Sequence, residues 1–300
     1  MIPFSTSCAY EIPLPAGHPF PMDKYSGVQG QLIYEGLVRV GDLTPAPLLT
    51  ESEALEVHSA AYWRQVMECD FSAQETRKIG FPASEALRDR SLSSAGGTLW
   101  CAHQALIKGI GINLAGGTHH AFRNRGEGYC VLNDIGIAAA CLLAERKVNK
   151  VLVVDLDVHQ GNGTAEIFAE DDRVFTFSMH GKDNYPLRKS FSDMDIALPT
   201  GTTDAVYLGH LYAALPGIIS SVKPDFIFYQ SGVDVLSGDR LGKLSLSMQG
   251  LGLRDAFVFS QAKAACIPIV SVMGGGYQEN LSALIDAHTQ TIKMAFDIYE

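Results

Sequence analysis

The sequence predicts an α/β fold in which one mostly parallel sheet carries helices on both faces. Short β-branched runs alternate along the chain with stretches of helical pattern, as repeated βαβ units require. The runs are apolar at consecutive positions, which is typical of strands buried on both faces. No Pro/Gly/Ser-rich linker divides the 300 residues. We therefore expect residues 1–300 to form a single domain, which is within the size range of one large α/β unit.

The expected elements follow from this alternation. Residues 1–50 are rich in proline and glycine, so we expect surface loops with short elements there. The predicted strands are Ile112–Ala115, Val151–Val154, Val174–Ser178, Phe226–Tyr229 and Ile267–Met273. The predicted helices are about Ser93–Lys108, Ile135–Glu145, Thr164–Phe168, Asp204–Leu215, Leu251–Ala265 and Leu281–Tyr299.

The longest uncharged stretch, Ala205–Val222, needs separate treatment because a membrane span is the alternative to a helix of a globular domain. It contains His210, Pro216 and two serines, which disfavour a span. We expect an amphipathic helix that ends near Pro216, since proline cannot donate the next helical hydrogen bond.

Composition excludes several classes of protein. The chain is 47% hydrophobic and 19% charged, which excludes disorder. Its 23 basic and 33 acidic residues give a net charge of −10. Direct nucleic-acid binding, which needs a basic surface, is disfavoured, whereas cationic ligands are compatible with this charge.

Targeting signals and cysteine spacing indicate where the protein resides. The six cysteines form no CxxC pair, which favours reduced thiols and a cytoplasmic location. Residues Met1–Tyr10 lack the basic and apolar regions of a signal peptide.

Polar side chains gather after four of the predicted strands. The segments are Gly116–His120, Asp155–His159, Gln230–Asp234 and Gly274–Tyr277. Ligands of open α/β sheets bind outside the carboxyl ends of the strands. We therefore expect these four segments to form one composite site.

Three residues of these segments form a candidate metal site. Asp157 and His159 lie two residues apart, so in an extended segment they point to the same side. Asp234 adds a third ligand from another strand end. Three protein ligands leave a position open for water or substrate, as in catalytic zinc sites, although Fe²⁺ or Co²⁺ also suits this set. On its own the Asp-x-Asp pattern is equally consistent with a solvated strand end.

The remaining polar residues suggest acid–base chemistry. The adjacent His119 and His120 are candidates for general base and acid, with Asp155 and Asn162 as partners that set their tautomers. A single histidine is more often structural, so this interpretation depends on the shared sheet edge. Tyr277 follows three glycines and is a candidate hydrogen-bond donor to an oxyanion. A phosphate loop at Gly274–Gly276 is a competing interpretation, but the segment lacks the full dinucleotide fingerprint.

Taken together, these motifs resemble the histone deacetylase superfamily, which has an arginase-like fold. The resemblance runs from about His18 to beyond Tyr277 and is closest to the class IV branch and its bacterial homologues. It rests on Gly116–His120, Gly126–Cys130, Asp155–Gly163 (DLDVHQGNG), Ser231–Leu246 (SGVDVLSGDRLGKLSL) and Gly274–Gln278 (GGGYQ).

The resemblance implies a role for each of the candidate residues. Asp157, His159 and Asp234 would bind Zn²⁺, with Fe²⁺ as a further option. His120 would act as general base and then acid, and Tyr277 would donate to the oxyanion. His119, paired with Asp155, would assist electrostatically.

It also implies a substrate tunnel and a second ion. Gly128 and Tyr129 would line the tunnel, and Tyr185 is a further candidate for its wall. A structural K⁺ would be held by Asp155, Asp157, His159, Ser178 and Met179, the first, third and fifth through main-chain oxygens.

The activity implied is zinc-dependent removal of an acetyl or longer fatty acyl group from lysine in proteins. Deacetylation of acetylpolyamines or another small acylated amine is the main alternative. A ureohydrolase with two metal ions and a non-catalytic acyl-lysine binding module are more distant ones.

The sequence departs from the family pattern at two places. Asn162 stands where many members have Asp, so His120 should be less basic and the reaction slower. Around Gly80-Phe81-Pro82 there is no equivalent of the aspartate with which other branches hold the substrate backbone. Selectivity for peptides is accordingly expected to be loose.

Overall fold

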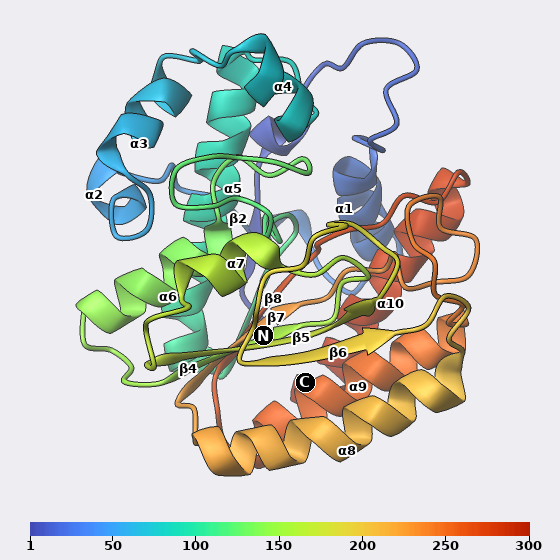
Figure 1. The fold of residues 1–300 in the computed structure, drawn as a ribbon. Coiled ribbons are helices and arrows are strands. Elements are labelled where there is room, and N and C mark those ends of the chain that lie inside the picture. The colour runs from blue at the N-terminus through green and yellow to red at the C-terminus, as the bar shows by residue number, and fades with distance from the viewer.

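A single parallel sheet of eight strands organises the computed structural model, which describes residues 1–300 (Figure 1). Its strand order is β2-β1-β3-β8-β7-β4-β5-β6, and every pairing is parallel. The strands are β1 (Phe4–Thr6), β2 (Leu43–Pro45), β3 (Ile110–Asn113), β4 (Val151–Asp155), β5 (Val174–Gly181), β6 (Met194–Leu198), β7 (Phe226–Gln230) and β8 (Ile269–Val272). The predicted fold class is confirmed.

Helices cover both faces of this sheet. They are α1 (Lys24–Tyr34), α2 (Glu51–Ala54), α3 (Ala60–Met67), α4 (Ala73–Ile79), α5 (Glu85–Lys108), α6 (Asp134–Ala144), α7 (Asn162–Ile167), α8 (Asp204–Val222), α9 (Met248–Ala264) and α10 (Leu281–Tyr299). Helix α10 packs against α1 and α9, and α9 packs against α8. Helices α5 and α6 pack together on the opposite side of the sheet (Figure 1).

The sequence prediction missed three strands, β1, β2 and β6, and four helices, α1 to α4. Strands β1 and β2 have only three residues each, and β6 at the sheet edge alternates half-buried and exposed positions instead of forming an apolar run. Residues 1–50 are therefore less loop-like than expected, since they also include α1. Gly27 and Gly30 obscure the helical pattern of α1, which buries Val28 and Leu32.

Helix α8 corrects the expectation of an end near Pro216. The helix continues through Pro216 to Val222. Pro216 lies on the exposed side, where water can solvate the carbonyl group that loses its partner. Helix α8 is long and apolar enough to span a membrane by length and composition. In the structure it packs on α9 and buries Leu211 and Leu215.

Helix α5 begins at Glu85, eight residues before the predicted start. The Ser84 side chain caps it by accepting a hydrogen bond from the Leu87 N–H at 3.1 Å. Two glycines inside the helix had weakened its pattern. At one of them, Gly96, an added Cβ would lie 2.0 Å from the carbonyl oxygen of Pro47. The glycine therefore lets the N-terminal segment pack directly on the helix.

The sheet order explains why polar residues from distant parts of the chain meet. Strands β3, β8, β7 and β4 are four consecutive central strands. Since all are parallel, their carboxyl ends lie side by side. The four polar segments singled out in the sequence follow these four strands.

Candidate active site

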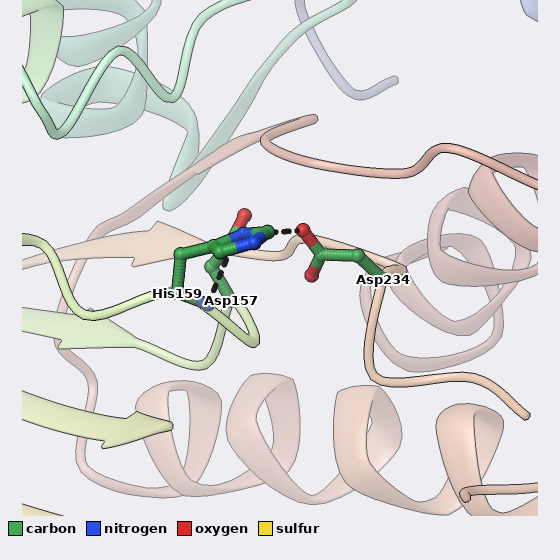
Figure 2. A group of neighbouring side chains, drawn as sticks. All are labelled: Asp157, His159 and Asp234. Atoms are coloured by element: carbon green, nitrogen blue, oxygen red, sulfur yellow. Dashed lines mark hydrogen bonds and ion pairs between the residues drawn. The ribbon is translucent and has the colours of Figure 1, made fainter. Parts of the chain in front are cut away.

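Asp157, His159 and Asp234 converge on one point at this edge of the sheet (Figure 2). Strand β4 ends at Asp155, so Asp157 and His159 lie in the loop that follows it. Their ligand atoms and that of Asp234 all lie within 4.8 Å of one another. The His159 Nδ1 atom is 3.1 Å from Asp157 Oδ1 and 3.1 Å from Asp234 Oδ2.

Main-chain amides fix the outward oxygens of the two carboxylates. The Gly275 N–H donates to Asp157 Oδ2 at 2.7 Å, and the Val158 N–H donates to Asp234 Oδ1 at 2.9 Å. The remaining oxygens are thereby directed toward His159. A Cβ at Gly275 would lie 1.9 Å from Asp234 Oδ2, so this position requires glycine for lack of space.

The charges of these three residues fit a bound cation. Burial and the neighbouring Asp157 carboxylate raise the pKa of Asp234 to about 7. Burial opposes the imidazolium form of His159, but the two carboxylates outweigh it and raise its pKa to about 10. A divalent cation would relieve the repulsion between the carboxylates. One nitrogen and two oxygen donors are a set that Zn²⁺ or Fe²⁺ accepts.

The loop after β3 delivers the two histidines. Gly116 and Gly117 take left-handed φ values of 80° and 82°, which glycine adopts without strain. The buried Asp134 of α6 accepts hydrogen bonds from the N–H groups of Gly117 at 3.0 Å and Thr118 at 2.7 Å. These bonds hold the loop at the sheet edge.

The two neighbouring histidines have different partners. His119 Nδ1 lies 2.7 Å from Asp155 Oδ2, and His120 Nδ1 lies 2.6 Å from Asn162 Oδ1. Burial opposes the charged form of His119, but Asp155 with Asp157 raises its pKa above the ordinary value. Burial and the two neighbouring histidines lower the pKa of His120. His120 is therefore neutral and able to accept a proton near pH 7.

Hydrogen bonds to its main chain fix the position of Tyr277. Its N–H donates to Asp239 Oδ2 at 2.6 Å, and its carbonyl oxygen accepts from Arg240 Nε at 3.1 Å. The ring centroid lies 6.3 Å from that of His159. Burial and the carboxylates of the site raise the pKa of Tyr277 well above its usual value. The phenol therefore stays protonated and available as a donor.

A cavity of about 420 Å³ leads from the surface to these residues. Its walls include the three predicted tunnel residues, Gly128, Tyr129 and Tyr185, and its inner end includes His120, His159 and Tyr277. We call the inner residues Asp157, His159, Asp234, His119, His120 and Tyr277 the tunnel floor. We call the exposed residues Arg77, Lys78, Asp183, Leu187, Leu241 and Lys243, which line the cavity at its entrance, the tunnel mouth.

Tyr129 narrows this tunnel from an unusual backbone position. Its φ of 66° is in the left-handed region, which non-glycine residues seldom occupy. A hydrogen bond of 2.7 Å from its N–H to the Ile79 carbonyl pins it there. Its ring centroid lies 5.1 Å from those of both Phe20 and Phe81. On the other wall, the Tyr185 ring stands perpendicular to His120 at 4.9 Å.

A smaller chamber of about 30 Å³ lies next to the tunnel floor. Tyr25, Arg90 and Gly274 are among the residues that line it. The Arg90 guanidinium donates to the Tyr25 hydroxyl at 2.7 Å, so one wall of the chamber is polar.

The residues predicted to hold K⁺ are also near one another. Asp155 and Ser178 are register partners across β4 and β5, and Met179 follows on β5. The Ser178 hydroxyl is hydrogen-bonded to His180 Nδ1 at 2.9 Å. The potassium ion itself stays a prediction.

Three residues of the site were not predicted from sequence. Asp239 holds Tyr277, and the Glu127 carboxylate accepts a hydrogen bond from Asn162 Nδ2 at 2.9 Å. Lys24 is fully buried, and its ammonium group donates to the Gly274 carbonyl at 3.0 Å. Burial lowers the pKa of Lys24 to about 8. Asp239 and Glu127 lie within or beside the recognised motifs, whereas nothing near Lys24 marks it in the sequence.

The fold and site define an α/β protein of the deacetylase and arginase type, with a candidate metal centre at the carboxyl edge of its sheet. A family model described as the histone deacetylase domain matches residues 18–292. The chain belongs to this family. The family consists of metal-dependent deacetylases, and the buried Asp-His-Asp set is compatible with a metal site.

Individual relatives support the same assignment. An uncharacterized protein of Picosynechococcus sp. is 42% identical over 291 residues, which cover 97% of each chain. Histone deacetylase 2 of Arabidopsis thaliana is 30% identical over 277 residues, covering 89% of this chain and 72% of that protein.

Solved structures share the fold. An HDAC homolog from Aquifex aeolicus has a TM-score of 0.83 at 25% identity, covering 98% of this chain and 83% of the other. Acetylpolyamine aminohydrolase from Burkholderia pseudomallei has a TM-score of 0.82 at 19% identity, covering 100% and 98%. The second likeness is one of fold alone.

Proposed function

We propose that this protein is a zinc-dependent deacetylase that acts on acetylated lysine in a protein or peptide. The observation that carries the proposal is the tunnel floor itself. At the end of one tunnel it combines an oxygen–nitrogen–oxygen donor set with a neutral, buried His120 and a protonated Tyr277.

Asp157, His159 and Asp234 would hold the metal ion. When bound, zinc would polarise the substrate carbonyl and lower the pKa of a water molecule. His120 accepts a proton from the attacking water through the ring nitrogen that Asn162 leaves free. The Tyr277 hydroxyl donates to the carbonyl oxygen as negative charge develops there. The water oxygen bonds to the carbonyl carbon, and as the carbon–nitrogen bond breaks His120 returns the proton to the leaving lysine amine, which leaves a free amine and acetate.

The size of the chamber beside the floor supports an acetyl group over a longer acyl chain. Its volume of about 30 Å³ is small beside the 420 Å³ of the tunnel. A methyl group fits such a space, whereas an octanoyl or myristoyl chain requires Arg90 and Tyr25 to move. This argument works against the long-chain preference suggested by the class IV resemblance.

The charges at the tunnel mouth favour lysine in a peptide over an acetylated polyamine. Arg77, Lys78 and Lys243 line the mouth, and Asp183 is the acidic residue there. A polyamine keeps further cationic amines after acetylation, and the three mouth cations would repel them. The net charge of −10 therefore does not describe the part of the surface that meets substrate.

A ureohydrolase and a non-catalytic binding module have less support. A ureohydrolase with two metal ions needs further bridging carboxylates. The chain has one group of at least three residues able to hold a metal, Asp157, His159 and Asp234. A non-catalytic binding module would lack an acid–base or oxyanion group, whereas His120 and Tyr277 are both present at the floor.

We also propose the K⁺ site at Asp155, Asp157, His159, Ser178 and Met179, and a cytoplasmic location. The six unpaired cysteines support the second of these, because thiols persist in a reducing compartment.

A substrate panel tests the proposal. Acetyl-, octanoyl- and myristoyl-lysine peptides and acetylated polyamines are assayed with and without a zinc chelator. We expect hydrolysis of the acetyl-lysine peptide that is abolished by the chelator and restored by Zn²⁺. His120→Ala should be inactive, while His103→Ala, which removes a partner of Glu145 at the surface, should match the native protein. Chelator-resistant activity or a preference for polyamines would overturn the proposal.

A further inference from the structure

We propose that Glu127 is a positioning residue for His120 and acts through Asn162. This inference rests on the function proposed above. The three side chains form a hydrogen-bonded row. Asn162 Oδ1 is 2.6 Å from His120 Nδ1, and Asn162 Nδ2 donates to Glu127 Oε1 at 2.9 Å.

The carboxylate of Glu127 determines the orientation of the Asn162 amide. An asparagine amide can turn by half a rotation and exchange its donor and acceptor ends. A carboxylate only accepts hydrogen bonds, so it retains the NH₂ end of the amide. The oxygen end must then face His120. Asn162 is 3% exposed, so water has little access to compete for the hydrogen bonds of its amide.

The orientation of the amide in turn fixes the tautomer of His120. Because the amide oxygen only accepts, His120 Nδ1 must carry the proton. The Nε2 atom is then the unprotonated nitrogen, which is the one a general base needs. Without Glu127 the amide could reverse, Nδ1 would accept, and the proton would move to Nε2. That tautomer cannot take a proton from water through Nε2.

Glu127 also supplies the charge that Asn162 lacks. When His120 takes a proton it becomes an imidazolium, which a neutral amide stabilises less than a carboxylate does. Glu127 places a negative charge one amide group away. The departure from the family pattern at Asn162 is thus partly compensated by a residue outside the Asp155–Gly163 motif.

Local main-chain structure positions Glu127. It lies between two glycines, and its carbonyl oxygen accepts a hydrogen bond from the Cys130 N–H at 3.0 Å. Its side chain is partly exposed in a second groove, which it lines together with Asn162, Tyr185 and Glu166. The same short loop carries Tyr129, so one segment shapes the tunnel and orients the base.

A charge exchange between the two positions tests the proposal. Glu127→Gln no longer fixes the amide, and we expect kcat to fall by about tenfold with KM changed by less than about twofold. Asn162→Asp sets two carboxylates against each other and should reduce kcat at least as much.

The double variant, Glu127→Gln with Asn162→Asp, rebuilds the row with the two roles reversed. The amide introduced at position 127 can donate to the carboxylate introduced at position 162, and that carboxylate still accepts from His120 Nδ1. We expect its kcat to return to within about threefold of native.

A matched control and a second readout complete the test. Glu166→Gln removes the same charge from the same groove, where Glu166 makes no side-chain hydrogen bond to Asn162, and should leave kcat unchanged. Ring ¹⁵N chemical shifts of His120, identified by their loss in His120→Ala, should show a protonated Nδ1 in the native protein and a tautomer mixture in Glu127→Gln. Melting temperatures confirm that each variant is folded.

The outcomes separate this proposal from the proposed function. If the losses in kcat of the two single variants multiply in the double variant, or if the His120 tautomer is unchanged in Glu127→Gln, Glu127 does not have this role. If no acylated amine is hydrolysed at all, the proposed function fails, but the tautomer measurement still decides whether Glu127 orients Asn162.

Discussion

The tunnel floor and the tunnel mouth are opposite in charge and in the way they are held. At the floor, the carboxylates of Asp157 and Asp234 are buried, and main-chain amides fix them at 2.7 and 2.9 Å. At the mouth, Arg77 and Lys78 are exposed, and no hydrogen bond or ion pair restrains their side chains. In the proposed function the floor carries out the chemistry, while the mouth affects which substrates bind.

The largest effect is expected at the floor, from Asp234→Asn. It removes one of the proposed metal ligands, so activity should fall by roughly 10³-fold or more, since a metal ion contributes several kcal/mol to such reactions. Metal content per chain, measured by atomic absorption, should fall in parallel. The exposed Asp172→Asn serves as the control. Retained metal with full activity would mean that Asp234 is not a ligand.

Tyr277→Phe is expected to have the next largest effect. Removal of one oxyanion donor typically reduces kcat by about 10²–10³-fold. Because Tyr277 is held through its main-chain N–H and carbonyl groups, which the substitution keeps, the folded structure should not change. Steady-state kinetics and a thermal melt check both statements. A loss confined to KM would show that Tyr277 only binds substrate.

Changes at the mouth should have a smaller effect that depends on salt. For Arg77→Glu with Lys78→Glu, we expect kcat/KM to fall by about fivefold for an acetyl-lysine peptide with acidic neighbours, because each exposed charge contributes little. Activity on an acetylated polyamine should rise. Both effects should disappear near 1 M salt, where the screening length is about 3 Å.

Arg146→Glu with Lys147→Glu is a matched control for this pair. These two residues are also exposed and adjacent near the end of a helix, but they lie away from the tunnel. They change the net charge by the same amount. If the control variant shows the same shift in preference, overall charge and not the mouth is responsible.

The smallest effect concerns pH. Burial and the neighbouring histidines lower the pKa of His120, so the ring stays neutral above that value and gains a proton only below it. We expect kcat/KM to change by less than about twofold between pH 6.5 and 7.5 and to decline at more acidic pH. A pH–rate profile on acetyl-lysine peptide measures this. A decline centred above pH 7 would contradict the assignment of His120 as base.

Much of the site was predictable because its residues follow strands that are easy to recognise. The runs at β3, β4, β7 and β8 are buried throughout, and the polar residues after them stand out in an otherwise hydrophobic context. A parallel sheet then brings its carboxyl ends to one edge without further information. Only the order of the strands, which makes these four consecutive, had to come from the structure.

The contacts that support the site were not predictable in the same way. Lys24, Glu127 and Asp239 have partners far away in the sequence, and no periodicity relates them to the residues they contact. The positive charge of the mouth could not be predicted for a similar reason. Arg77 and Lys243 are distant in sequence, and the net charge of the whole chain is negative. The continuation of α8 beyond Pro216 depended on which side of the helix faces solvent.

The order of the four central strands has a consequence for how the protein matures. They span residues 110–272, and β4 and β7, whose following loops carry the proposed metal ligands, pair directly. Tyr277 and the Gly275 N–H that fixes Asp157 join them only when β8 has inserted between β3 and β7. Such long-range pairing forms late and slowly during folding. A nascent chain that has not yet released its last segment has no complete site. A chain cut before β8 should therefore not hydrolyse substrate, and it should hold the proposed metal ion more weakly because the Gly275 N–H that fixes Asp157 is missing.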